Sequence, residues 1–348
     1  PRTSASALPA PAGLSAPNFG PAAGSNVLRF IPQANLANLD PIWTTQYVVR
    51  NGALLIWDML YGVDDKLEPQ PQMVEGHEVT ADFMTWTFKL RSGLKFHDGE
   101  PVRSKDVVAS ITRWMARDAT MGLPIKKRLN ALEAVDDRTF RFRLNAPYPK
   151  MLFALGKSST PCLFIMPERI ASTDPFKQIN EYVGSGPMRF MKDQWVPGAK
   201  AIFERFADYV PRTEKANWLS GGKRINFDKI EWHIVPDGAT AAAALENGEV
   251  DWWETPLPDL VPLLKKHAGV AVDPLYRAHR PVTVADVYAP GQWNAHLPDA
   301  FASLSLPHRA IPNAGHPPPA HPPPPHSPPP PPPPAPPPPP PAPRPDQT

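Results

Sequence analysis

The sequence predicts an α/β fold with a mixed sheet, and three stretches carry this prediction. Residues 230–251 contain a strand, a helix and a second strand in succession. Short connections in this order favour two parallel strands in one sheet. Residues 84–90 alternate between apolar and polar side chains, and residues 132–144 predict two antiparallel strands joined by a tight turn. Parallel and antiparallel strands are therefore both expected.

Length and charge narrow the possible classes of protein. With 348 residues the chain can hold two domains and bury a sizeable core. Its net charge of +2 and its lack of basic clusters interleaved with aromatics argue against a nucleic-acid binder. The single cysteine, Cys162, excludes an internal disulfide and a cysteine-based metal site, and we expect it to be buried.

Composition divides the chain into three regions. Residues 1–26 are rich in Ala, Pro, Ser and Gly, which suits either the end of a secretory signal with a short linker or an ordinary disordered N-terminus. Residues 27–274 have the patterns of a folded region. Residues 275–348 form a low-complexity tail in which many of the 51 prolines gather. Proline lacks the donor that a sheet needs and cannot continue a helix, so polyproline II or disorder is expected there.

The folded region opens with a strand and a helix. Residues 27–31 predict the strand, and residues 38–41 predict a turn. Thr44 or Thr45 is positioned to cap the following helix. The buried face of that helix is predicted from apolar side chains at helical spacing: Tyr47, Val48, Leu55, Met59 and Leu60.

Residues 85–113 form the most regular stretch of the chain. One strand face is predicted to be buried and comprises Met84, Trp86, Phe88 and Leu90. Residues 94–96 predict a second short strand, and His97-Asp98-Gly99 predicts a turn in which Asp98 bonds its own backbone. Ser104 is expected to cap a helix whose apolar positions are Val107, Val108, Ile111 and Trp114.

Further elements follow in order. A hairpin over residues 132–144 turns at Asp136-Asp137. The turn 184–187 precedes a strand at 188–191, and residues 201–206 return antiparallel to it. The crossover comprises a strand at 230–235, a helix at 239–245 that ends at Asn247-Gly248, and a strand that starts at Glu249.

No catalytic residue, metal site or cofactor is predicted. His97 and Glu100 are read as parts of a turn and not as ligands. Arg141 and Arg143 are interpreted as a solvated strand face, with an anion site as the alternative. The glycines of residues 184–186 are not followed by the lysine of a phosphate-binding loop. No G-x-S-x-G motif frames a nucleophile.

The stretch WTFKLRSGLKFHDGEPVRSKDVVAS resembles the signature segment of the family 5 extracellular solute-binding proteins. These are the peptide-, nickel- and opine-type receptors of bacterial ABC importers. Residues 39–41 (LDP) and 245–251 also fit the family pattern. Residues 184–188 (GSGPM) resemble the family's Gly-Thr-Gly-Pro-Tyr-like stretch, but with Ser185 and Met188 as departures, which makes a ligand contact from Met188 doubtful. The resemblance covers residues 27–274.

The resemblance implies a periplasmic binding protein-like fold (type II, cluster C) and a binding protein instead of an enzyme. The expected function is the substrate-binding component of an ABC importer. Its expected partners are an oligopeptide or another small solute and an ABC permease in the inner membrane, and nucleic acid is not among them. A monomer is expected, in the periplasm or, for a Gram-positive source, at the cell surface.

The resemblance also suggests where a solute binds. Trp43, Thr44, Thr45 and Tyr47 are expected near the ligand, while ordinary core packing is the alternative for the two aromatics. Trp253 is a further candidate, because ligands of open α/β sheets lie beyond strand carboxyl ends and an indole can flank an apolar group. Core or hinge packing is the alternative for Trp253.

The tail does not resemble the family's continuation. We therefore expect the second lobe to be largely missing and solute binding to be impaired. For the change in composition we hypothesise a reading-frame shift near residue 275, with a native tail as the alternative. Two other functions stay open. The tail could dock into grooves that recognise polyproline II, although Arg344 is the only basic residue near it. A secreted α/β hydrolase would need a paired nucleophile and base, which the sequence does not offer.

Overall fold

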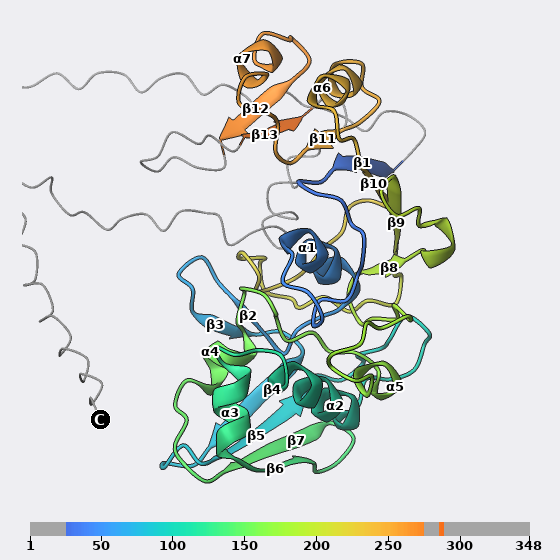
Figure 1. Ribbon diagram of the computed structural model, residues 1–348. Helices are drawn as coiled ribbons and strands as arrows, with labels where there is room; N and C mark the ends of the chain where they lie inside the picture. Colours follow the sequence, from blue (N-terminus) through green and yellow to red (C-terminus); the bar gives the residue numbers. More distant parts are fainter. Residues whose placement is uncertain (1–25, 275–284, 289–348) are drawn as a thin grey trace, which may run out of the picture. The chain divides into compact units, whose positions relative to one another are not determined.

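A seven-stranded mixed sheet contains strands from both ends of the region that the computed structural model describes, residues 26–274 and 285–288. Its strand order is β12-β13-β11-β1-β10-β9-β8 (Figure 1). β1 runs parallel to both β10 and β11, and the other neighbours are antiparallel. The strands are β1 (Val27–Ile31), β8 (Met188–Phe190), β9 (Lys200–Arg205), β10 (Lys229–His233), β11 (Trp252–Trp253), β12 (Ala271–Pro274) and β13 (Ala285–Tyr288). The predicted mixed sheet is confirmed.

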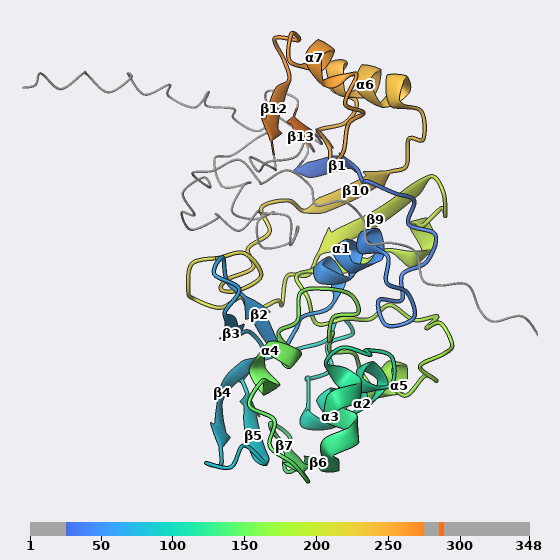
Figure 2. The same ribbon diagram turned by 60° about the vertical axis from the view of Figure 1, so that its left-hand side comes forward.

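The predicted crossover is present, with a shift at its end. Helix α6 (Gly238–Glu246) connects β10 to β11, and both strands flank β1. The Asp237 side chain accepts a hydrogen bond from the backbone N–H of Thr240 and so caps the helix. Gly248 has a φ of 71°, as expected for a residue that follows a helix end. The strand was predicted to start at Glu249, but it comprises only Trp252 and Trp253. Helix α7 (Val261–Leu264) then precedes β12, and α6 and α7 lie side by side in Figures 1 and 2.

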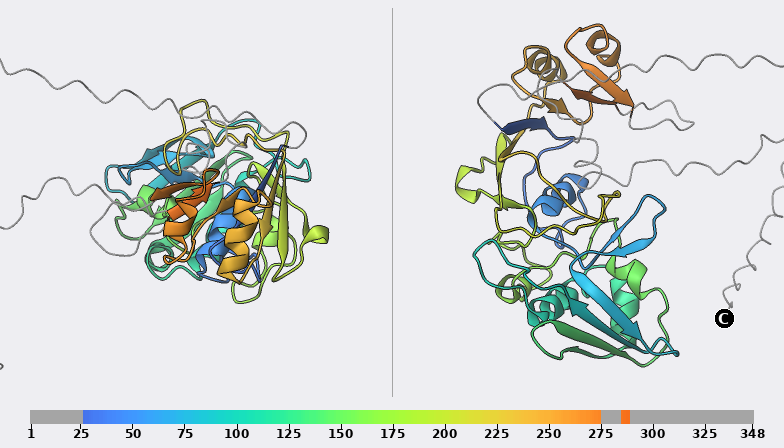
Figure 3. Two further views of the ribbon diagram at one scale, coloured as in Figure 1. Left: turned by 90° about the horizontal axis from the view of Figure 1, so that it is seen from above. Right: turned by 180° about the vertical axis from the view of Figure 1, so that it is seen from behind.

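A second sheet is antiparallel, has four strands in the order β4-β5-β7-β6 and packs against helix α2 (Figure 3). The predicted alternation is confirmed for Trp86, Phe88 and Leu90, which are buried, whereas Met84 is half-buried and precedes β5. The predicted hairpin is also confirmed, with the Asp136 carboxylate accepting from the backbone N–H groups of Arg138 and Thr139. The elements are β4 (Val74–Val79), β5 (Thr85–Leu90), β6 (Leu129–Ala134), β7 (Thr139–Leu144), α2 (Ser104–Met115) and α3 (Gly122–Arg128).

The remaining described elements are short, except for α1. They are α1 (Tyr47–Ile56), β2 (Tyr61–Val63), β3 (Pro69–Pro71), α4 (Met151–Leu155), α5 (Glu168–Ala171) and the 3-10 helix η1 (Lys192–Gln194). Within the part of the chain that the structure covers, no helix has the length and apolar character that a membrane span requires.

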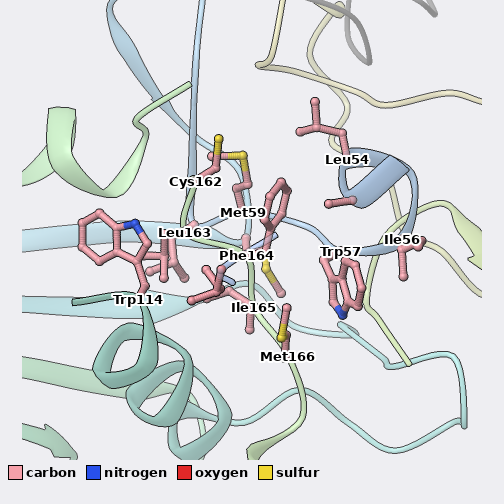
Figure 4. Packing of buried hydrophobic residues seen from close by; sticks show 14 of the residues in the cluster. Leu54, Ile56, Trp57, Met59, Trp114, Cys162, Leu163, Phe164, Ile165 and Met166 are labelled. Atoms are coloured by element: carbon pink, nitrogen blue, oxygen red, sulfur yellow. The ribbon is translucent and has the colours of Figure 1, made fainter. Parts of the chain in front are cut away.

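One apolar cluster extends from the seven-stranded sheet to the four-stranded sheet. Figure 4 shows side chains of residues 162–166 between Trp114 of α2 and Trp57, which follows α1. The Trp114 indole N–H donates to the backbone oxygen of Pro161 at 3.0 Å, so this buried polar group is satisfied. Cys162 is buried as predicted, and burial raises the pKa of its thiol to about 11.

Two predicted helix caps are wrong. Helix α2 begins at Ser104 itself, and its N-cap is Arg103, whose backbone N–H donates to the Asp106 carboxylate at 2.8 Å. The Ser104 hydroxyl donates to the backbone oxygen of Asp136 in the hairpin turn, so a tertiary contact has taken the group that local rules assign to capping. Helix α1 begins at Tyr47 after Gln46, later than a cap at Thr44 or Thr45 requires.

Two further predicted segments differ in the structure. Residues 94–96 were predicted to be a strand, but they form only an isolated bridge, between Lys95 and Pro101. β13 lies inside the region that was expected to be a low-complexity tail, and it pairs with β11 and β12. The expectations for residues 1–25, 275–284 and 289–348 fall outside the described residues.

The His97-Asp98-Gly99 turn is confirmed and has a buried anchor. The Asp98 carboxylate accepts from the backbone N–H of Glu100, and Gly99 has a φ of 89°. The His97 ring is 8% exposed, and its Nδ1 accepts from the backbone N–H of Gly184 at 3.1 Å. Its Nε2 therefore carries the proton and donates to the Gly186 oxygen at 3.0 Å. The histidine ties the turn to residues 184–186.

A neutral His97 is expected to make stability depend on pH. Burial lowers the pKa of His97 to about 4, from an ordinary value of 6.5. Its contribution is therefore fully present above pH 6.5 and is lost as pH falls towards 4. Relative to a His97→Gln variant, the unfolding free energy of the wild type should fall by about 3 kcal/mol across this range.

Urea unfolding of both chains at a series of pH values measures this difference. Asp251 and Glu254 have raised pKa values and act in the opposite direction. Their contributions cancel when the variant is subtracted from the wild type. Parallel pH curves for the two chains would contradict the assignment of a neutral, buried ring.

Candidate functional site

The carboxyl ends of β1 and β11 meet at one edge of the sheet, because the two strands are parallel. Ligands of open α/β sheets bind beyond such an edge. Gln33 follows β1 and Glu254 follows β11, and α1 supplies Arg50 and Asn51 next to them. The sequence brings these residues from three separate segments, so their meeting is a tertiary feature.

Glu254 connects the three segments. It is 4% exposed, and its Oε2 accepts from the backbone N–H of Gln33 at 2.9 Å. Its Oε1 accepts from Nδ2 of Asn51 at 3.3 Å, and its own backbone N–H donates to Ile31. Burial raises the pKa of Glu254 to about 7, while the Gln33 hydrogen bond and the nearby Arg50 charge act against this rise.

Arg50 extends the cluster towards the surface. Its Nη2 and Nε donate to Oδ1 of Asn51 at 3.1 and 3.4 Å, and its Nη1 donates to the Ser158 oxygen at 3.1 Å. The guanidinium carbon lies 4.5 Å from the centre of the Tyr47 ring, within the range of a cation–π interaction. Arg50 is itself buried, whereas Tyr47 is 40% exposed.

Trp43, Thr44, Thr45 and Tyr47 lie within residues 43–47, and we call these four residues the candidate solute surface. Trp43 is 37% exposed, Thr45 is exposed and Thr44 is partly exposed. The two aromatics are therefore not ordinary core residues, which was the alternative interpretation. Two side chains hold the backbone of this segment: Arg117 donates to the Trp43 oxygen at 2.9 Å, and the Thr160 hydroxyl donates to the Thr45 oxygen at 3.0 Å.

The Trp253 side chain is not part of the candidate solute surface. It is 5% exposed and belongs to a small apolar cluster between the sheet and its helices, with Ile31, Ala241, Leu245, Val250 and Leu264. Its surroundings are those of core packing. Its neighbour Glu254 was not predicted as a site residue, although a carboxylate directly after a buried strand is a signal that could have identified it. Met188, whose ligand contact was already doubtful, is fully buried.

Other parts of the described surface have depressions and ion pairs, but they do not gather polar groups as the Glu254 region does. A depression of about 330 Å³ lies beside the His97 turn and β8, and one of about 520 Å³ lies between α2 and α5. Arg143 is exposed and pairs with Glu133 at 3.3 Å, as a solvated strand face requires. Within residues 26–274 and 285–288, no group of three His, Cys, Asp or Glu side chains could hold a metal ion.

Comparison with known proteins places the chain in a family. Residues 68–293 match the bacterial extracellular solute-binding proteins, family 5 middle region. A probable peptide ABC transporter periplasmic-binding protein, y4tO of Sinorhizobium fredii, is 38% identical over 70% of this chain and 46% of its own length. The glutathione-binding protein GsiB of Escherichia coli is 28% identical over 68% of this chain and 44% of its own.

Solved structures agree on the fold. The periplasmic binding protein DppA of Helicobacter pylori, in complex with the peptide STSA, is 26% identical, with a TM-score of 0.58. The match covers 71% of this chain and 50% of that one. A binding protein for agropinic acid, AgaA from A. tumefaciens, has the same TM-score at 24% identity and so supports the fold alone. The predicted periplasmic binding protein-like fold is confirmed.

The chain spans about half the length of the relatives that it matches. The family match nevertheless covers well over half of its own 348 residues. It includes the signature segment, the hairpin, the glycine-rich turn and the crossover to β11. The chain therefore belongs to the family 5 bacterial extracellular solute-binding proteins.

Proposed function

We propose that this chain is a solute-binding component of an ABC importer and that it binds peptides at the candidate solute surface. The proposal is supported chiefly by the position of Trp43–Tyr47. Two exposed aromatics and two threonines lie together on a segment that leads into α1, whose Arg50 and Asn51 lie at the carboxyl edge of β1 and β11. Aromatic rings can flank apolar side chains, and hydroxyls can bond a peptide backbone.

The names of the relatives favour peptides over the other solutes of the family. The y4tO protein is described as a probable peptide-transporter component, and DppA was solved with a tetrapeptide. GsiB binds glutathione, which is itself a short peptide derivative. As part of the same proposal, the chain is exported, acts as a monomer and delivers its solute to an ABC permease. It is also proposed to bind its solute without catalysing a reaction, as suits a family of binding proteins.

A thermal-shift titration tests this function. A ligand that binds the native state adds RT ln(1 + [L]/Kd) to the unfolding free energy and so raises the melting temperature. We expect di- to hexapeptides to raise it in a concentration-dependent way, and nickel chelates and small sugars to leave it unchanged.

Two variants locate the effect. Tyr47→Ala should melt cooperatively and lose most of the peptide response. Val196→Ala removes an exposed apolar side chain beside β9, three strands away from β11 in the sheet order, and should retain the response. A cooperative wild-type melt that no peptide shifts would overturn the proposed peptide binding. A response retained in Tyr47→Ala would instead move the binding site away from this surface.

A further inference from the structure

A chain of polar contacts leads from the buried end of β11 to the exposed Tyr47 ring. Glu254 accepts from Asn51, Asn51 accepts from Arg50, and the Arg50 guanidinium lies under the Tyr47 ring. We propose that Glu254 is a positioning residue for the candidate solute surface, and that the charge of its carboxylate sets the placement of Tyr47 through Asn51 and Arg50. The expected effect of Glu254 on peptide binding rests on the proposed function, but its effect on the placement of Tyr47 can be tested without any ligand.

The Asn51 amide can satisfy both neighbours in one orientation only. Arg50 is a donor without acceptor capacity, so Oδ1 of Asn51 must face it. Nδ2 of Asn51 then necessarily faces Glu254, and an ionised carboxylate is a stronger acceptor for this donor than a protonated carboxyl. The Asn51 amide thus couples the Arg50 guanidinium to the charge of Glu254.

Protonation of Glu254 weakens this arrangement. Both of its oxygens accept hydrogen bonds in the structure, one from Gln33 and one from Asn51. A protonated carboxyl keeps its carbonyl oxygen as a good acceptor, but its hydroxyl oxygen accepts only weakly, so one of the two N–H donors loses a strong partner. The Gln33 donor is part of the backbone, so Asn51 is the partner that is free to turn, and turning it releases its bond to Arg50.

The charges around Glu254 allow it to titrate near neutral pH. Burial raises its pKa to about 7, and Arg50 of α1 is the cation that opposes this rise. Tyr47 lies on Arg50, and Cys162 also faces Arg50 but is a neutral thiol, with a pKa raised to about 11. At the other end of β11, Asp251 pairs with Arg29 at 3.8 Å. A change in Glu254 charge therefore falls within the physiological pH range.

Fluorine NMR of the full chain labelled with 3-fluorotyrosine measures Tyr47 directly. The chain has 7 tyrosines, and the Tyr47 resonance is assigned by its loss in Tyr47→Phe. In the wild type we expect this resonance to move with pH, with a midpoint near the Glu254 pKa of about 7. In Glu254→Gln it should stay at the position that the wild type reaches at low pH. The matched control Glu249→Gln changes an exposed acid five residues earlier and should titrate as the wild type does.

A second variant, Asn51→Ala, tests the proposal even if Glu254→Gln does not fold. Asn51→Ala leaves both charged groups in place and removes the link between them, so the Tyr47 titration should disappear while Arg50 and Glu254 remain. A Tyr47 resonance that is constant with pH in the wild type overturns the proposal. A titration that persists in both Glu254→Gln and Asn51→Ala overturns it as well.

Peptide affinity supplies the functional readout. The dissociation constant of a responding peptide should rise below pH 7 in the wild type and should vary little with pH in Glu254→Gln. A wild-type dissociation constant that is independent of pH, together with a titrating Tyr47, would refute the link to binding. If no peptide binds at all, the proposed function fails while the NMR titration still decides the role of Glu254.

Discussion

Replacing Arg113 with methionine is expected to reduce the unfolding free energy by about 3–5 kcal/mol, because it leaves a buried carboxylate without its counter-charge. Arg113 of α2 donates to both oxygens of Asp40, at 3.1 and 2.7 Å, and the two side chains are 2% and 1% exposed. It also donates to the backbone oxygens of Thr173 and Lys177. The Arg113 guanidinium thus connects helix α2 to the Asp40 turn and to residues 173–177.

The same carboxylate organises the approach to the candidate solute surface. Asp40 accepts from the backbone N–H groups of Ile42 and Trp43, and from that of Ile179. Loss of Arg113 is therefore expected to weaken the proposed solute binding as well as stability, because the turn that precedes Trp43 loses its anchor.

Urea unfolding at neutral pH measures the loss, and Arg143→Met is the matched control. Arg143 forms an exposed ion pair with Glu133, and its removal should cost less than about 1 kcal/mol. The double variant Asp40→Asn with Arg113→Met should be less destabilised than the sum of the single variants, since the unpaired charge is gone. A cost below 1 kcal/mol for Arg113→Met alone would contradict the importance of the buried pair.

Gly184→Ala should be the second severe change. A Cβ at this position would lie 1.9 Å from the backbone oxygen of Ile56 and 2.6 Å from its carbonyl carbon. Both are backbone atoms at the end of α1, so relief requires the helix end or the glycine-rich turn to move. That movement also disturbs the hydrogen bond from Gly184 to His97. We expect a loss of about 3 kcal/mol or more, at the upper end of what overpacking costs.

Gly76→Ala is a control with the same chemistry. A Cβ on Gly76 would meet no atom within 4 Å, and the residue lies in β4. Because alanine restricts the unfolded chain more than glycine does, this variant should be neutral or slightly stabilised. Equal urea midpoints for Gly184→Ala and the wild type would show that the turn is able to move away from α1 at little cost.

Much of the fold was predictable because its signals are local. The alternation over residues 86–90 and the Asp136-Asp137 turn are confirmed, since period-two burial and turn chemistry depend on neighbours in the sequence. The crossover through α6 was predictable because its N-cap, Asp237, and the glycine after its C-terminal end, Gly248, are adjacent to the helix in the sequence. The family follows from the same kind of contiguous information.

Predictions failed where a distant segment competed for a group. Ser104 has the right residue type for a helix cap, but its hydroxyl donates to a turn that lies about thirty residues later in the chain, where a tertiary acceptor replaces the local one. Trp253 was a ligand candidate because of its place after a strand and its indole, with core packing as the alternative, and in the structure apolar side chains of α6 and α7 cover it. β13 lies in a region whose composition carries no periodic signal, and its pairing with β11 and β12 comes from the sheet.

The sequence by itself predicted most of the longer elements, the mixed sheet and the family, and it suggested the segment Trp43–Tyr47 as a solute surface. Only the tertiary structure decided which backbone and side-chain groups support that segment. Gln33, Asn51 and Glu254 come from positions up to 221 residues apart, and their types are unremarkable in isolation. Parallel pairing of β1 and β11 brings two of these segments to one edge, and α1 packs beside them. Burial then removes water from a carboxylate, a guanidinium and an amide, so the amide bonds both of its charged neighbours, and this requirement arises only in the folded chain.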